Sequence, residues 1–87
     1  MKNNKKIKIQ NEIGKMLLSK GLNKKKLSQG YDFVKSGDVD SLNVILLISD
    51  IEKKFKFKFK KNHLQKKNFH TLGEITSIVY KNTKWQI

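Results

Sequence analysis

The amino-acid sequence predicts an all-α fold, a small bundle of four helices, three long and one short, with a long loop between the first two. Apolar residues recur at helical spacing in three stretches, near residues 5–20, 41–55 and 71–81. The strand-like alternation at 55–59 has no second such stretch to pair with, and a lone strand is not stable. The chain therefore predicts a single domain, 1–87, with its core at about 9–80 and loosely ordered ends.

The first helix is predicted over about residues 5–20. One apolar stripe at helical spacing is formed by Ile9, Ile13, Met16 and Leu17. Gly21 stands just past the last turn, a position where glycine commonly ends a helix. Residues 21–40 then read as a loop, because glycine, serine and asparagine are frequent there. The side chains expected to attach this loop to the core are Leu22, Leu27, Phe33 and Val34.

The second helix is predicted to begin near residue 40, with the Asp40 carboxylate as its N-cap. Its core side is traced by Leu47, Ile51 and Phe55. The apolar arc is wider than that of an ordinary surface helix, since Val44 and Leu46 fall toward the opposite face. Two interpretations stay open: the helix is packed on several sides, or it exposes apolar residues to a partner.

Three phenylalanines alternate with lysines in Phe55–Lys60, and we interpret this stretch as a helix end followed by an extended connector. Burying each ring is worth roughly 1.5–3 kcal/mol, which favours rings anchored in the core. The alternative, lysines on phosphates with exposed rings stacked on bases, needs those rings in solvent. Residues 62–68 are expected to form a short turn of helix.

The last helix is predicted over about 71–81, because Thr71 and Glu74 match a capping box. Trp85 and Ile87 are expected either to fold back on the core or to stay loose.

Composition excludes several classes of function. There is no cysteine, so there is no thiolate site, and His63 and His70 without a third ligand make a poor zinc site. We therefore expect no metal. No glycine-rich phosphate loop and no positioned triad is present, which indicates that the protein is not an enzyme. No apolar run is long enough to span a membrane and no secretory signal is recognisable, so a cytoplasmic location is expected.

The formal net charge is +13, yet all twenty basic residues are lysine. Arginine makes the commonest specific base contact, so its absence disfavours specific nucleic-acid recognition. A basic helical module that binds nucleic acid or an anionic surface remains the alternative function. The charge changes sign in residues 31–52, which carry five acids and one lysine. Ser41 lies in this acidic segment, at the predicted entrance of the second helix.

Four groups of residues around this serine share the spacing of one family. Asp40-Ser41-Leu42 matches its attachment motif, and Phe33-Val34 stands eight and seven residues before the serine. Ile51–Phe55 matches the aliphatic-Glu-x-x-Phe end of its second helix, and Asn68–Leu72 matches the segment leading into its last helix. On these matches the chain resembles the acyl carrier proteins and the related peptidyl and D-alanyl carrier proteins, over about residues 9–80.

The resemblance implies an acyl-carrier-like bundle in which Ser41 bears a covalent 4′-phosphopantetheine, framed by Asp40 and Leu42. A phosphopantetheinyl transferase (holo-carrier synthase) would attach it from coenzyme A, which would make the chain a phosphoprotein. The thiol of the arm would hold an acyl or aminoacyl group as a thioester. A loading ligase and acyltransferases of fatty acid or lipid biosynthesis would then be its partners, and the carrier would be a monomer.

The sequence departs from the family in its second helix. Typical members have a strongly acidic helix there, whereas this chain has Asn43, Val44 and Leu46 where acids or polar groups are common. We therefore expect docking to rely on apolar contact. The residues expected to recognise partners are Asp38, Asn43, Val44, Ile45, Leu46 and Asp50. A structural adaptor that binds through the same apolar face is a further hypothesis.

Overall fold

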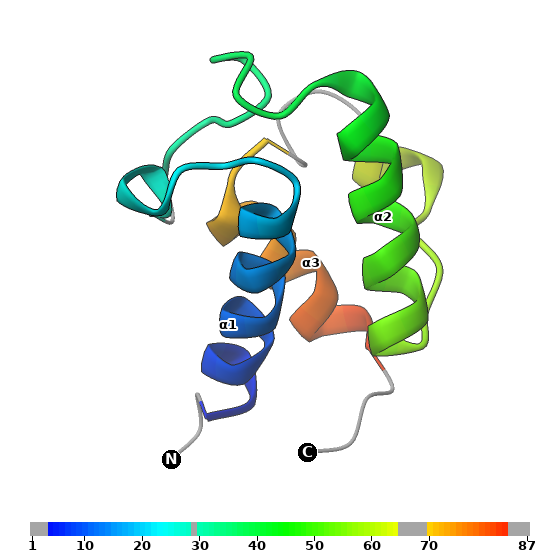
Figure 1. Cartoon of the computed structure of the whole chain (residues 1–87). Coiled ribbons are helices and arrows are strands. Elements are labelled where there is room, and N and C mark those ends of the chain that lie inside the picture. Colours follow the sequence, from blue (N-terminus) through cyan, green and yellow to red (C-terminus); the bar gives the residue numbers. More distant parts are fainter. Residues whose placement is uncertain (1–3, 29, 65–69, 84–87) are drawn as a thin grey trace.

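The computed structural model describes residues 4–28, 30–64 and 70–83, which form an all-helical structure (Figure 1). The described residues contain no strand, which confirms the predicted all-α class. Their elements are α1 (Asn4–Ser19), the 3-10 helix η1 (Lys24–Lys26), α2 (Ser41–Phe55), the 3-10 helix η2 (Lys61–Leu64) and α3 (Leu72–Asn82). None of these helices is both long and apolar enough to cross a membrane.

The predicted fourth helix over 62–68 overlaps the single turn η2, and the rest of that stretch lies outside the described residues. Trp85 and Ile87 also lie outside them. The structure thus has three α-helices in its described part.

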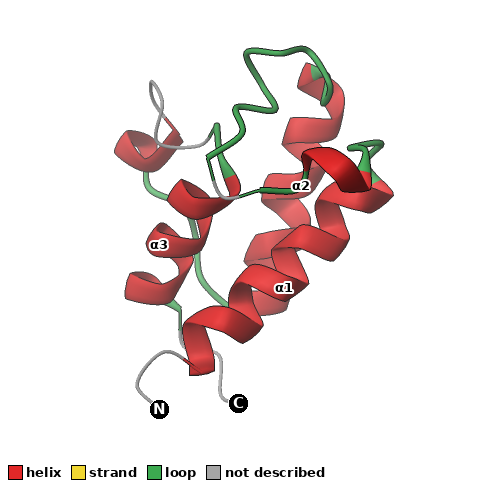
Figure 2. Cartoon of the chain, turned by 90° about the vertical axis from the view of Figure 1, so that its left-hand side faces the viewer, coloured by secondary structure: helices red, strands yellow, loops and turns green. Residues whose placement is uncertain are grey.

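The core forms where the three α-helices meet, and α1 packs both on α3 and on α2 (Figures 1 and 2). Each helix contributes a stripe of fully buried or nearly fully buried side chains. These are Ile9, Ile13 and Leu17 from α1, Leu47, Ile51 and Phe55 from α2, and Leu72, Ile75 and Val79 from α3. The periodicity in the sequence therefore identified the buried stripes of α1 and α2.

The end of α1 is fixed by the predicted glycine. Gly21 has a φ of +104°, a left-handed conformation that is rare for residues with a side chain. The backbone N–H of Leu22 donates to the carbonyl of Leu17 at 3.1 Å, and that of Gly21 donates to Leu18 at 3.2 Å. These two bonds are the Schellman pattern, and the contact between buried Leu17 and Leu22 accompanies it.

The connector after α2 turns its phenylalanines toward the core, as predicted. Phe55 is fully buried, while Phe57 and Phe59 are partly buried against the core. The rings of Phe57 and Phe59 meet edge to face, with centroids 4.8 Å apart. The connector is held to α2 because the N–H of Phe59 donates to the Glu52 carboxylate at 2.9 Å.

The predicted N-cap Thr71 of α3 is confirmed, with the Glu74 carboxylate on the Thr71 hydroxyl where a full capping box has it on the Thr71 N–H. The Thr71 hydroxyl accepts a hydrogen bond from the Glu74 N–H and donates one to the Glu74 carboxylate, both at 3.1 Å. The helix begins one residue after Thr71, as expected for a residue in the N-cap position.

Candidate functional site

Ser41 is the first residue of α2 and is exposed. Asp40 before it has extended backbone, and its carboxylate accepts a hydrogen bond from the Asn43 N–H at 2.9 Å. The predicted N-cap is therefore confirmed. The Ser41 hydroxyl consequently lies at the positive end of a fifteen-residue helix, where negative charge is favoured.

The loop that leads to Ser41 is anchored on Phe33, whose side chain is only 1% exposed. The backbone N–H of Phe33 donates to the carbonyl of His70 at 3.1 Å, and its own carbonyl accepts from Val39 at 3.2 Å. Of the four predicted anchors, Leu22 and Phe33 are buried, and Leu27 and Val34 are partly buried against the core. Val39 is a fifth anchor, which sequence periodicity missed because it stands alone between two aspartates.

Asp38, predicted to recognise partners, is bound within the loop. Its carboxylate accepts hydrogen bonds from the Tyr31 hydroxyl and from the Ser36 hydroxyl, and the Lys26 ammonium lies 3.4 Å away. The Tyr31 hydrogen bond is the largest cause that holds the pKa of Asp38 below its usual value, with Ser36 and Lys26 adding to it. Asp38 therefore stabilises the conformation of the loop before Ser41.

The other acids of segment 31–52 also have partners. Asp32 accepts from the Lys35 N–H at 2.7 Å, and its other oxygen lies 3.2 Å from Nδ1 of His70. The Lys35 N–H is the largest cause that lowers the pKa of Asp32, followed by His70. Asp50, a second acid predicted to recognise partners, forms an ion pair with Lys20 at 2.7 Å.

Acid is therefore expected to weaken the fold. Because the pKa values of Asp32 and Asp38 are lowered in the folded chain, below an unfolded value of about 3.9, the unfolded chain binds more protons at low pH. Their stabilisation is present near neutral pH and is lost as the pH falls below about 4. Thermal unfolding followed from about pH 7 to about pH 3 measures this loss.

The matched variant is Asp38→Asn, which keeps an oxygen that accepts the Tyr31 hydrogen bond. It should melt below the wild type near pH 7 and lose less of its melting temperature than the wild type on acidification. Equal losses in the two proteins would contradict the assignment.

A groove of about 510 Å³ lies directly beside Ser41. Its lining consists mainly of apolar side chains and includes Val34, Gly37, Val39, Asp40, Ser41, Val44 and Ile45. The prediction that Val44 faces away from the core is wrong: Val44 is partly buried and packs against the core. The reason is its position, three residues before buried Leu47 and seven before buried Ile51, which places all three on one helix face.

The opposite face of α2 carries large apolar side chains into solvent. The side chains of Leu42, Ile45 and Leu46 are 65%, 62% and 44% exposed. The wide apolar arc is thus divided: Val44 packs against the core, whereas Leu42, Ile45 and Leu46 are exposed to solvent. The predicted residues Asp40 to Leu46 thus lie together at the start of α2, whereas Asp50 lies about 14 Å from Ser41 along the helix axis.

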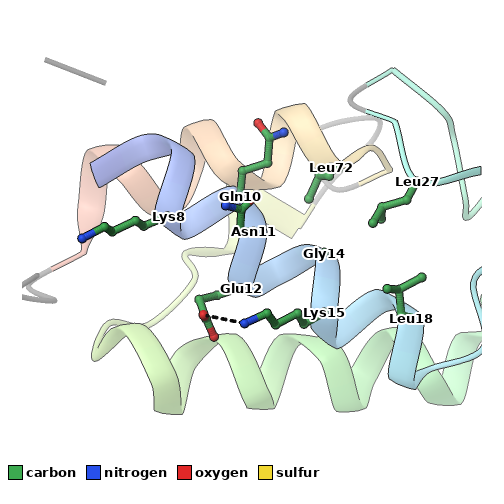
Figure 3. A pocket seen from close by; sticks show the side chains of 9 residues that line it. All are labelled: Lys8, Gln10, Asn11, Glu12, Gly14, Lys15, Leu18, Leu27 and Leu72. Atoms are coloured by element: carbon green, nitrogen blue, oxygen red, sulfur yellow. Dashed lines mark hydrogen bonds and ion pairs between the residues drawn. The ribbon is translucent and has the colours of Figure 1, made fainter. Parts of the chain in front are cut away.

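A second cavity, of about 630 Å³, is lined mainly by α1, together with Leu27 of the loop and Leu72 at the start of α3 (Figure 3). Its lining combines polar side chains with the apolar Leu18, Leu27 and Leu72, and contains the Lys15–Glu12 ion pair at 3.5 Å. It includes none of the predicted site residues. Over the described part of the chain, no cluster of three metal-ligating side chains occurs.

No protein-family model matches the chain, and no curated protein matches it at a significant level.

Proposed function

We propose that this protein is a carrier of the acyl-carrier type, an acyl-carrier-like helical bundle that bears 4′-phosphopantetheine on Ser41. The observation that carries the proposal is the exposed Ser41 at the capped start of α2, within Asp40-Ser41-Leu42 and beside an apolar groove. When bound, the arm supplies a thiol that holds an acyl or aminoacyl group as a thioester. The carrier then delivers that group to partner enzymes and is itself not an enzyme.

The residues present fit such a group. The phosphodiester formed on Ser41 is an anion, and the helix N-terminus favours an anion by typically 0.3–1 kcal/mol. The hydroxyl is exposed, so a transferase can reach it. The apolar walls formed by Val34, Val39 and Val44 are suited to shelter an apolar part of the arm or its cargo.

Attachment requires little of the carrier. The Ser41 oxygen forms the new bond to the phosphorus of coenzyme A next to the pantetheine, 3′,5′-ADP leaves, and the hydroxyl proton passes to a base on the transferase. Asp40 contributes by fixing where the helix starts, through its bond to the Asn43 N–H.

The alternative function, a basic module that stacks phenylalanines on bases, is less well supported. Phe55 is fully buried, and Phe57 and Phe59 pack against the core. Stacking on bases needs exposed rings, so only the lysines of the connector are available to a polyanion.

The proposal is tested by incubating the protein with coenzyme A and a broad-specificity phosphopantetheinyl transferase and measuring its intact mass. We expect the wild type to gain the mass of one arm and Ser41→Ala to gain none. Ser49→Ala is the matched control, because it removes a hydroxyl from the same helix two turns further on, and it should gain one arm.

Two outcomes would overturn the proposal: a wild type that gains no arm, or an arm that persists on Ser41→Ala. Because Ser41 is exposed, we expect its substitution to leave the fold unchanged. Circular dichroism of each variant checks this.

A further inference from the structure

The outer face of α2 is defined here by four exposed residues that follow Ser41, namely Leu42, Ile45, Leu46 and Lys53. Leu42, Ile45 and Leu46 follow the i, i+3, i+4 spacing with which a helix lies in an apolar groove of a partner. Three adjacent side chains, each at least 44% exposed, form a patch of the kind that marks an interaction site.

An enzyme that reaches the Ser41 hydroxyl along the outer side of α2 also contacts this face. Ile45 lies one turn after Ser41 on the same side of the helix, and Leu46 lies about 7.5 Å from Ser41 along the axis. A partner that approaches from this side meets an apolar surface next to the serine.

The charge at the far end of the outer face is positive. Lys53 is exposed in the last turn of α2, and Lys56 is exposed directly after it. The acids of this half of the helix are held by other groups: Asp50 pairs with Lys20 at 2.7 Å, and Glu52 accepts the Phe59 N–H at 2.9 Å. Asp50 is still 44% exposed, but its pair with Lys20 is neutral as a whole, so the net charge at this end comes from lysine.

The near end of the outer face differs in sign, because the exposed Asp40 precedes Ser41. Asp40 and Lys53 are thirteen residues apart, which is about 20 Å along a helix. This separation exceeds twice the Debye length of about 8 Å at physiological ionic strength. A charged group of a partner placed at one end therefore interacts little with the charge at the other end.

We infer that the phosphopantetheinyl transferase that modifies Ser41 docks an apolar groove on the outer face of α2 and places carboxylates against Lys53. This inference rests on the proposed function. The apolar contact supplies affinity, and the lysine end sets the direction of docking, so that the active site of the transferase meets the end of the helix that carries Ser41.

The same observations disfavour two other occupants. An anionic membrane presents one sign of charge along the whole face, so it would attract Lys53 but repel Asp40. A second copy of the chain also carries a net charge of +13, and the two copies repel each other.

The experiment uses the full chain and the phosphopantetheinyl transferase encoded in the same genome, with coenzyme A as co-substrate. KM for the carrier and kcat are measured for the wild type, Lys53→Glu and Leu46→Glu. Lys81→Glu is the matched control, because Lys81 is an exposed lysine in the last turn of a different helix, α3. All variants should retain their helical circular dichroism spectrum.

We expect Lys53→Glu to raise KM about tenfold at low salt with little change in kcat, and the effect to shrink as salt is added. Leu46→Glu should raise KM further, and Lys81→Glu should stay within about twofold of the wild type. A KM for Lys53→Glu that equals or falls below the wild-type value overturns the inference while leaving the proposed function intact. A wild type that gains no arm overturns both.

Two further measurements decide between occupants. Co-sedimentation with vesicles of phosphatidylcholine and phosphatidylserine, lost in Leu46→Glu, would assign the face to a membrane and overturn the inference. A dimer in analytical ultracentrifugation that Leu46→Glu dissociates would assign it to a second copy, with the same consequence.

Discussion

The variant Phe55→Ala is expected to lose about 3–5 kcal/mol of unfolding free energy, the usual cost of truncating a fully buried phenylalanine. An 87-residue domain is typically stable by only about 4–13 kcal/mol. The melting temperature should therefore fall by at least about 12 °C. Thermal unfolding followed by far-ultraviolet circular dichroism measures the change.

The control for this prediction is Phe57→Ala. Phe57 carries the same side chain two residues later, but it is only partly buried, so its truncation exposes less new apolar surface and leaves a smaller cavity. We expect it to lower the melting temperature by no more than half as much. Equal effects of the two substitutions would show that the connector contributes as much packing as the end of α2, and would contradict this prediction.

The variant Phe33→Ala is expected to lose a similar 3–5 kcal/mol and, in addition, to free the loop before Ser41. Phe33 is the side chain that anchors this loop in the core, and its backbone bonds to His70 and Val39 depend on that position. Cleavage by trypsin after the exposed Lys35 should become at least about tenfold faster, because the loop opens more often than α1 or α2.

Val34→Ala is the matched control, since it truncates the next residue, which is only partly buried. It should change the rate of cleavage after Lys35 by less than about threefold. If Phe33→Ala melts at a lower temperature but is cleaved after Lys35 no faster than elsewhere, the loop is held by its hydrogen bonds and the anchoring role assigned to the ring is wrong.

The helix boundaries were predictable because their signals are local. Gly21, Asp40 and Thr71 each lie within a few residues of the backbone groups that they satisfy, so the sequence alone placed the end of α1 and the starts of α2 and α3 within about one residue. The buried stripes were predictable for a similar reason, since the helical period determines which side chains share a face.

The structure of the loop before Ser41 was not predictable in the same way. Asp38 is bound by Tyr31 and Lys26, and Asp32 lies against His70, thirty-eight residues away in sequence. These pairs form only when the chain is folded, and no period or motif relates their positions. Acidic residues that looked available to a partner are for this reason occupied within the chain.

The exposure of the α2 side chains was only partly predictable from the sequence. Periodicity identified its core side but misplaced Val44, because a wide apolar arc does not show where the buried sector ends. The positions of neighbouring elements decide this, and the loop residues Val34 and Val39 complete the environment of Val44.

The bond between Phe33 and His70 has a consequence for the order of events during synthesis. The ribosome adds residues from the N-terminus, so Ser41 exists in the growing chain long before His70 and Thr71 have been added. Helix α1 can form early, since its bonds are local, but the loop cannot reach its final conformation until its partner carbonyl has emerged. The loop before Ser41 is thus completed only by residues from the last quarter of the chain. A truncated product of translation would contain Ser41 but would lack the His70 carbonyl that holds this loop.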